Sequence, residues 1–372
     1  MISCLHCLMK AAMGRSMLRT MCRTILLLIF SVVAVHAEKL WYPVEVDVWE
    51  PPFANTLQRG IESYAPLKKA QRKWRIHVFI PHLKDAYWLG VNYGFIDEAR
   101  RLGVKLSIFE AGGYDRLHIQ RRQIEEGLAQ KPDGLIVGAI SYDGLNDILQ
   151  NLHDSGTPIV DSINGISPKV ITARVAADFR DLGLQTGAYL IRLQEKSEKP
   201  LSVAWFPGPK GAGWVEAGDR GFKTAIQESS VRIVASQYGD TGIAVQKKLV
   251  GTVLDRHADV LDVVVGTAAT AEAAVKVLKR RGLSKRIKVL SYYYSPGVHR
   301  GIRRGKILAA PTDQPVLQAR IAVDVMVRIL EKKNYFKHSA PRVMLVDGGN
   351  VKQWDSTSTL APRGFRPIFS ND

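Results

Sequence analysis

The chain has 372 residues, of which 46% are hydrophobic and 23% charged, a composition typical of a globular protein with two or three domains. Its formal net charge is +17, but the basic residues are scattered in short groups such as "KRRG" and "RGIRRG" and form no basic helix. A solvated basic surface that faces an acidic partner or anionic lipid is therefore a better interpretation than a nucleic-acid interface.

The first segment has the features of a secretory signal peptide. Its cations are Lys10, Arg15, Arg19 and Arg23. They precede the apolar run 25–35, which ends just before the small residue Ala37. A membrane anchor is the weaker alternative, because about eleven apolar residues cannot cross a hydrocarbon layer of about 30 Å. We expect export and cleavage near Ala37, so that residues 1–37 are the signal peptide and the mature chain carries a charge of +13.

All three cysteines, Cys4, Cys7 and Cys22, lie in this leader. The "CLHC" pair resembles a redox or zinc motif but would be removed with it. The residues before Met17 or Met21 add nothing that a leader needs, so translation could begin at either methionine. The mature chain would have no disulfide and no thiolate nucleophile, and its stability would come from its core.

After an irregular stretch, short apolar runs alternate with segments of helical period such as "WLGVNYGFIDEARRLG" and "AEAAVKVLKRRG". The strand-like runs are 74–80, 104–111, 134–139, 157–163, 173–178, 201–208, 231–239, 260–268, 287–294 and 307–312. Apolar runs buried on both faces and separated by amphipathic helices predict parallel sheets in an α/β architecture. About ten strands exceed one comfortable sheet, so we expect two doubly wound lobes.

Polar and aromatic residues follow the carboxyl ends of several predicted strands. The stretches are "PHLKDAYW", "EAGGY", "DSIN", "ADF", "SYYY" and "TDQP". Ligands of such sheets bind beyond these ends, so the stretches would converge on one cleft if the lobes face each other. Taken alone, Tyr87 and Trp88 at a helix start would be core residues. Rings at the ends of separate strands favour a shared binding site instead.

Catalytic and nucleotide-binding motifs are missing from the sequence, including G-x-x-x-x-G-K-[ST], H-E-x-x-H and G-x-S-x-G. The glycine-rich "GPKGAGWVEAG" (208–218) fits neither nucleotide fingerprint and is better interpreted as a flexible strand-to-helix loop. Nothing pairs the carboxylates Asp85, Asp178 and Asp313 with a nucleophile, and the histidines are dispersed. The chain is therefore interpreted as a binding protein without a cofactor or metal, and not as an enzyme.

The mature chain resembles the type I periplasmic binding proteins and, within them, the trimethylamine-N-oxide sensors. The matching blocks include "LKDAYWLGVNYGF" (83–95), "EAGGY" (110–114), "PGPKGAGW" (207–214), "VVVGTAATAEAA" (263–274), "LSYYYSPGVHRGIRRGKI" (290–307) and "GFRPIF" (364–369). The resemblance implies two lobes, joined by three crossovers, that close around a small solute. It also implies a periplasmic complex with the sensor domain of a membrane histidine kinase.

The resemblance also gives expected boundaries. They are an N-terminal extension at 38–72, lobe 1 at 73–177 and 293–313, lobe 2 at 178–292 and 314–348, and a C-terminal tail at 349–372.

The resemblance further implies a site with aromatic walls and a few polar groups. The matching positions are Asp85, Tyr87, Trp88, Tyr114, Phe179 and Tyr293, with Asn164, Asp178, Asp313 and Gln314 as further candidates at strand ends. The cage walls would be Trp88, Tyr114, Phe179 and Tyr293. Tyr87 would supply a hydroxyl, and Asp85 would orient a water or a tyrosine hydroxyl, or face a cationic methyl shell. Such a shell is attracted to π-faces by about 0.5–2 kcal/mol per ring, and an N-oxide oxygen needs donors.

Two neighbouring positions depart from the family pattern. Phe179 stands where the family has tryptophan and offers a weaker cation–π surface, and Asp178 stands where the family has proline. The ligand could then be another amine oxide, a methylated amine or a more polar solute. The same lobes would also serve a transport receptor that delivers a sugar-like or amine solute to an ABC permease. Among Tyr292, Tyr293 and Tyr294, strand alternation and the resemblance favour the middle ring as the one that faces the site.

Overall fold

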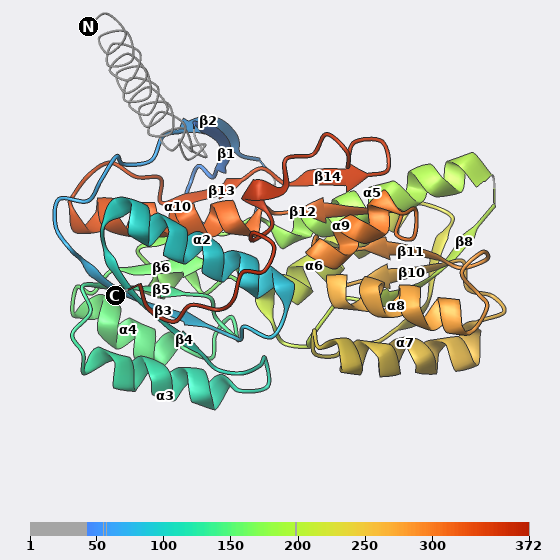
Figure 1. Ribbon diagram of the computed structural model, residues 1–372, viewed down its shortest axis with the longest axis horizontal. Coiled ribbons are helices and arrows are strands. Elements are labelled where there is room, and N and C mark those ends of the chain that lie inside the picture. Colours follow the sequence, from blue (N-terminus) through green and yellow to red (C-terminus); the bar gives the residue numbers. More distant parts are fainter. Residues whose placement is uncertain (1–42, 55, 57, 198, 372) are drawn as a thin grey trace, which may run out of the picture. The chain divides into compact units, whose positions relative to one another are not determined.

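The computed structural model describes residues 43–371, apart from residues 55, 57 and 198. The expected signal peptide at 1–37 lies outside the described residues. The described chain forms two α/β lobes, each built on a largely parallel sheet with helices packed against it (Figure 1). This architecture confirms the fold that the sequence predicts.

The sheet of lobe 1 has eight strands in the order β2-β1-β13-β7-β6-β5-β3-β4. Their bounds are β1 (Val44–Val48), β2 (Gly60–Tyr64), β3 (Arg75–Ile80), β4 (Lys105–Glu110), β5 (Gly134–Val137), β6 (Ile159–Ser162), β7 (Ala173–Val175) and β13 (His338–Pro341). From β13 to β4 the neighbours are parallel, whereas β1 and β2 run antiparallel to theirs. The helices of this lobe are α2 (Ala86–Leu102), α3 (Leu117–Leu128), α4 (Asn146–Asp154) and α10 (Pro315–Leu330). Helices α2 and α10 pack together on one side of the sheet, and α3 and α4 lie on the other (Figure 1).

The main sheet of lobe 2 is parallel, in the order β11-β10-β8-β9, and a two-stranded antiparallel sheet, β12-β14, lies beside β11. The strands are β8 (Leu201–Phe206), β9 (Val231–Ser236), β10 (Val263–Gly266), β11 (Lys288–Ser291), β12 (Ala309–Thr312) and β14 (Met344–Asp347). The helices are α5 (Phe179–Ser197), α6 (Gly213–Ile226), α7 (Ile243–His257), α8 (Ala268–Arg280) and α9 (Pro296–Arg303). Helices α5 and α6 pack against each other, as do α7 and α8.

Helix α2, which carries part of the candidate site, has clear local start and stop signals. The Asp85 carboxylate caps its first turn by accepting a 3.0 Å hydrogen bond from the backbone N–H of Trp88. The helix ends at Gly103, whose φ of 79° is in the left-handed region that glycine tolerates. In its middle, Gly94 allows close contact with α10, since a Cβ there would lie 2.9 Å from the Cβ of Ala319.

Several of the expected boundaries are wrong. The segment 38–72 is not a separate extension in its described part, because β1 and β2 complete the sheet of lobe 1. The segment 293–313 belongs to lobe 2, since α9 packs on α8 and β12 lies beside β11. Most of 314–348 belongs to lobe 1, because α10 is buried between α2 and the strands β5, β6 and β7, and β13 pairs with β7. Only β14 of that segment pairs in lobe 2.

Three short segments carry the chain between the lobes: 176–178 after β7, 313–314 after β12, and 342–343 after β13. Gln318 of α10 bonds to the first two. Its Oε1 accepts from the backbone N–H of Ala177 at 2.8 Å, and its Nε2 donates to the Asp313 carboxylate at 2.6 Å. The C-terminal segment then returns to lobe 1, where the N–H of Ile108 in β4 donates to the carbonyl of Phe369.

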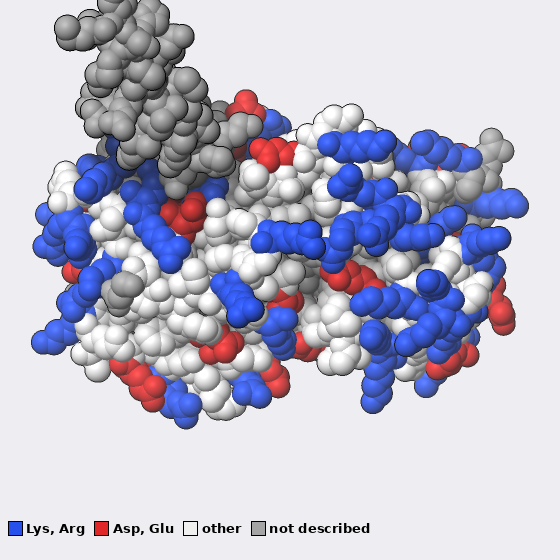
Figure 2. All heavy atoms as spheres, in the orientation of Figure 1, with Lys and Arg blue, Asp and Glu red and all other residues white. Residues whose placement is uncertain are grey.

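Lysine and arginine side chains are spread over both lobes on the face shown in Figure 2, with fewer acidic groups among them. This distribution agrees with the dispersed basic residues of the sequence. Among residues 43–371, apart from the three gaps, we find no helix whose length and hydrophobicity would let it span a bilayer.

Candidate functional site

Nine side chains from both lobes enclose a small cavity, which we call the cage. Its lining is Asp85, Tyr87, Trp88, Tyr114, Asn164, Phe179, Trp214, Thr241 and Tyr293. All of them follow the carboxyl ends of parallel strands or begin the next helix, which is where ligands of such sheets bind. The centre of a water-sized sphere can occupy about 20 Å³ of this cavity, so the cage suits a compact solute.

The six rings of the cage contact one another edge to face or at a tilt, and not in a flat stack. The Tyr87 ring lies 5.3 Å from the Tyr293 ring at 67°, and the Trp214 ring lies 6.0 Å from the Tyr293 ring at 82°. Trp214 is also 6.0 Å from Tyr114 and 5.7 Å from Phe179. Mutual contact of this kind fixes the orientation of each ring, so the walls are organised without a ligand.

Asp85 is fixed by bonds on both of its carboxylate oxygens. One oxygen caps α2, and the other accepts a 3.1 Å hydrogen bond from the Thr241 hydroxyl of lobe 2. His82 lies behind this pair, with its Nε2 3.4 Å from the Thr241 hydroxyl and 3.9 Å from Asp85. Burial lowers the pKa of His82, so its ring is neutral at neutral pH.

Tyr87 is held by a buried carboxylate outside the cage. Its hydroxyl donates to Asp313 over 2.5 Å, and the second oxygen of Asp313 has no hydrogen-bond partner among the described residues. Burial raises the pKa of Asp313. Burial and the neighbouring carboxylate raise the pKa of Tyr87 well above its usual value, so this hydroxyl keeps its proton and acts as a donor.

Asn164 and Tyr114 form a second polar pair in the wall. The amide Nδ2 of Asn164 donates to the Tyr114 hydroxyl at 3.1 Å and to the Ala139 carbonyl at 2.7 Å. Burial raises the pKa of Tyr114 and that of Tyr293, so both phenols are neutral. The cage therefore offers neutral hydroxyls and π-faces, with one carboxylate, that of Asp85, in its lining.

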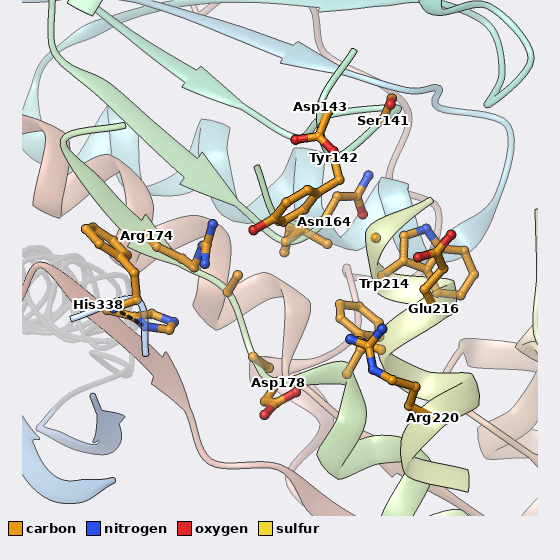
Figure 3. A pocket seen from close by; sticks show the side chains of 18 of the residues that line it. Ser141, Tyr142, Asp143, Asn164, Arg174, Asp178, Trp214, Glu216, Arg220 and His338 are labelled. Carbon is orange, nitrogen blue, oxygen red and sulfur yellow. Dashed lines mark hydrogen bonds between the residues drawn. The ribbon is translucent and has the colours of Figure 1, made fainter. Parts of the chain in front are cut away.

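A larger cavity, which we call the vestibule, adjoins the cage and shares Asn164, Phe179 and Trp214 with it. The centre of a water-sized sphere can occupy about 470 Å³ of it. Its polar and charged lining includes Ser141, Tyr142, Asp143, Arg174, Asp178, Glu216, Arg220 and His338. Figure 3 shows Tyr142 and Arg174 on one side of this space and Glu216 and Arg220 of α6 on the other.

Direct contacts join the two lobes at the cage. Besides the bond between Thr241 and Asp85, the Lys84 ammonium of lobe 1 forms a 2.9 Å ion pair with Asp240 of lobe 2. Tyr114 of lobe 1 contacts Trp214 of lobe 2 through their rings. The lobes are therefore closed on each other in this structure.

Seven of the ten expected site residues line the cage: Asp85, Tyr87, Trp88, Tyr114, Asn164, Phe179 and Tyr293. Asp178 lines the vestibule instead. Asp313 lies behind Tyr87 and acts on the cage through it. Gln314 lines neither cavity, and its amide donates to the Arg342 carbonyl where two crossovers meet. Of the three adjacent tyrosines, Tyr293 is the one that lines the cage, whereas Tyr292 and Tyr294 are buried elsewhere.

Sequence reasoning missed two residues of the lining, Trp214 and Thr241. Trp214 lies within the glycine-rich stretch that the sequence suggests is a flexible loop, yet the residue is 4% exposed and its ring contacts three other rings of the cage. Its position between the end of a strand and the start of a helix is the signal that could have identified it as a site residue. Thr241 follows β9 in "GDTG", a stretch whose composition predicts only a turn.

The described residues hold no group of three or more His, Cys, Asp or Glu side chains arranged to bind a metal ion. The site therefore has to be judged by its rings and hydrogen-bonding groups.

Comparison with known proteins agrees with this geometry. Residues 76–334 match the family model of the periplasmic binding protein domain. The periplasmic protein TorT of Escherichia coli O157:H7 is 36% identical over 311 residues, which cover 83% of this chain and 88% of TorT.

Two solved structures are also similar. One is an ABC transporter solute-binding protein from Bradyrhizobium sp. BTAi1 with bound Bis-Tris, at 45% identity and a TM-score of 0.77, covering 88% of this chain and 98% of that one. The other is the complex of the TorS sensor domain with TorT in the presence of trimethylamine N-oxide, at 30% identity and a TM-score of 0.72, covering 80% of this chain and all of the other. From these matches and from its two-lobed fold, the chain belongs to the periplasmic binding protein family, as a TorT-like member.

Proposed function

We propose that this protein is a periplasmic sensor that binds trimethylamine N-oxide, or a related methylated amine or amine oxide, in the cage. The observation that carries the proposal is the convergence of six aromatic rings from both lobes on one small cavity. A methylated nitrogen presents a rounded, partly positive shell that the faces of such rings attract. All of the ten site residues predicted from the sequence, except Gln314, would then act in or beside that cavity.

The oxide end of such a ligand needs hydrogen-bond donors. The indole N–H of Trp214 is buried and has no hydrogen-bond partner among the described residues. An unmade hydrogen bond of this kind costs about 1–3 kcal/mol, which an acceptor in the cavity would offset. The neutral hydroxyl of Tyr293 is a further donor within the same walls.

We further propose export through the signal peptide at 1–37 and signalling to a TorS-like membrane histidine kinase. The relatives named TorT, and the complex of TorT with the TorS sensor domain, support this partner. Closure that depends on the ligand would present a different lobe arrangement to the receptor. Closure could shift the conformational equilibrium of the receptor only to the extent that the closed form binds the receptor more tightly than the open form does.

The alternative is delivery of an amine or a sugar-like solute to an ABC permease. It is favoured by the relative from Bradyrhizobium, which is described as an ABC transporter solute-binding protein and holds Bis-Tris, an amine with hydroxyl arms. The same cage would serve either role, because sensing and transport differ in the docking surface and not in the ligand site.

Titration calorimetry on the chain from residue 38 onward tests the ligand, with trimethylamine N-oxide and D-ribose as the two probes. We expect saturable binding of the amine oxide far below the concentrations at which it acts as a general osmolyte. Binding of ribose alone would reject the amine-oxide site. Mixing the loaded protein with a TorS-type sensor domain then separates the roles, since a sensor forms a complex with that domain and a transport receptor does not.

A further inference from the structure

We propose that the vestibule is a second compartment of the ligand site, which takes a hydroxylated arm attached to the methylated nitrogen in the cage. This inference rests on the proposed function, since it assumes that the cage binds the nitrogen head. It predicts that the preferred ligand is larger than trimethylamine N-oxide and carries several hydroxyl groups.

The two cavities are continuous in their lining. Asn164, Phe179 and Trp214 contribute to both, so an arm that leaves the cage beside these three side chains would enter the vestibule. The centre of a water-sized sphere can occupy only about 20 Å³ of the cage, against about 470 Å³ of the vestibule. The head would therefore fix the position of the ligand, and the vestibule would select its arm.

Two of the charged side chains of the vestibule, Arg174 and Asp178, are neutralised in ion pairs. Arg174 forms a 2.5 Å ion pair with Asp161 and donates to the carbonyl of Ile166. Asp178 accepts from Arg180 through both the backbone N–H, at 2.8 Å, and the guanidinium, at 3.3 Å. These pairs leave polar edges rather than net charge.

Three charged side chains of the vestibule have no ion pair with any described residue: Asp143, Glu216 and Arg220. The two carboxylates accept hydrogen bonds and the guanidinium donates them. His338, which also lines the vestibule, is neutral because burial lowers its pKa to about 3. A carboxylate arm would meet two like charges here. A hydroxyl suits this lining better, because each hydroxyl both donates and accepts and so can bond to Glu216 and Arg220 at once.

The arrangement also differs from a plain entrance to the cage. Aromatic and polar groups line the end of the vestibule away from Trp214, where the Trp49 ring stacks on His338 at 4.0 Å and the Arg174 guanidinium lies 5.6 Å from the Phe53 ring centre. Trp49, which is 2% exposed, and His338, which is 6% exposed, are buried side chains that line this space. A channel that serves only for entry would not need mutually packed side chains of this kind in its lining.

The experiment compares two ligands that share one head. They are trimethylamine N-oxide and N,N-dimethyl-D-glucamine N-oxide, in which a pentahydroxylated arm replaces one methyl group. D-glucitol, the arm without the head, is the third probe. Each is titrated by calorimetry into the parent chain and into Glu216→Gln and Arg220→Gln. Glu228→Gln, in the turn after α6, and Lys276→Gln, on α8, remove comparable exposed charges outside both cavities and serve as matched controls.

We expect the glucamine oxide to bind at least tenfold more tightly than trimethylamine N-oxide. Glu216→Gln and Arg220→Gln should each weaken the glucamine oxide about three- to tenfold, as expected for the loss of one ordinary hydrogen bond, and leave trimethylamine N-oxide within about twofold. The control variants should change neither affinity.

The possible failures are distinguishable. If trimethylamine N-oxide binds and the glucamine oxide binds equally or more weakly, the second compartment is rejected and the cage proposal stands. If the glucamine oxide binds more tightly but neither vestibule variant affects it, the arm lies elsewhere and the inference is also rejected. If neither amine oxide binds, the proposed function itself fails.

Discussion

The Tyr87 hydroxyl donates a 2.5 Å hydrogen bond to Asp313, so one ring of the cage is anchored to a segment that joins the two lobes. Asp313 is completely buried and has no cationic partner among the described residues within ion-pair distance. Its carboxylate is supported by Tyr87 and by the amide of Gln318. A buried carboxylate with so few partners makes the tyrosine bond important for stability.

We therefore expect Tyr87→Phe to lower the free energy of unfolding by about 1–3 kcal/mol, because it leaves the Gln318 amide as the one remaining side-chain donor to the buried Asp313 carboxylate among the described residues. Urea denaturation measures this change. Asp313→Asn in the same background should recover part of the loss, since an amide is less costly to bury than a carboxylate. Tyr335→Phe, outside both cavities, is the matched control. An unchanged midpoint for Tyr87→Phe would contradict the anchoring role.

Phe179→Trp should tighten trimethylamine N-oxide binding about two- to tenfold, because an indole offers a stronger cation–π surface than a phenyl ring. Since Phe179 lines both cavities, the larger ring should also narrow the passage and weaken a ligand with a hydroxylated arm. Calorimetry with both amine oxides measures the two effects. Phe369→Trp, at a phenylalanine that is 54% exposed, controls for the added indole. An unchanged affinity for trimethylamine N-oxide would count against Phe179 as a cage wall.

The ion pair between Lys84 and Asp240 joins the lobes, so it favours the closed form. We expect Asp240→Asn to weaken ligand binding about two- to fivefold, in line with the strength of an exposed ion pair, and this loss should shrink as salt is added. Asp255→Asn removes a similar 2.8 Å pair, with Arg281, between two helices of lobe 2 and should leave the affinity unchanged. Equal effects of the two variants would show that the bridge between lobes has no special role.

Stability should fall as the pH decreases below about 6.5, in part because of His338. Its pKa is lowered from 6.5 to about 3 by burial, and its Nδ1 accepts a 3.2 Å hydrogen bond from the backbone N–H of Phe53. Between these two pH values the unfolded chain binds the proton that the folded chain excludes, so unfolding becomes easier at lower pH. His338 alone can contribute a slope of about 1.4 kcal/mol per pH unit in this window.

The variant His338→Asn tests this slope, because the amide oxygen can replace Nδ1 as the acceptor and cannot be protonated. The free energy of unfolding, measured in urea at several pH values from 7 to 4, should depend less steeply on pH than in the parent chain. His118→Asn, at an exposed position on α3, should leave the slope as it was. If His338→Asn retains the full slope, other groups dominate the acid response.

Sequence reasoning succeeded where local patterns decide the structure. Nine of the ten apolar runs form strands of the two parallel sheets, whereas 307–312 forms β12 of the antiparallel pair. The predicted helix start at Tyr87 and Trp88 is that of α2, where the Asp85 carboxylate accepts from the Trp88 N–H. Strand alternation separates Tyr293 from its two neighbours, because adjacent side chains of an extended segment point in opposite directions, and the family resemblance favoured the middle ring, which lines the cage.

Long-range pairing was the main source of error. Strand β1 pairs with β13 nearly 300 residues later, and neither segment carries a signal for the other. Helix α10 has an apolar surface that would suit either lobe, and its packing against α2 and against β5, β6 and β7 places it in lobe 1. Trp214 was missed because glycines on its N-terminal side suggest mobility, whereas they allow the close turn that brings the indole into the cage.

The two hydrogen bonds of the Gln318 amide have a consequence for opening. The amide oxygen of Gln318 accepts from the backbone of Ala177, and its NH2 group donates to Asp313. Two of the three segments that join the lobes are therefore bonded to the same side chain. Neither of these two segments can move by itself without breaking a buried hydrogen bond. We therefore expect the lobes to hinge as a single cooperative motion about a common axis, rather than to twist around one connection at a time.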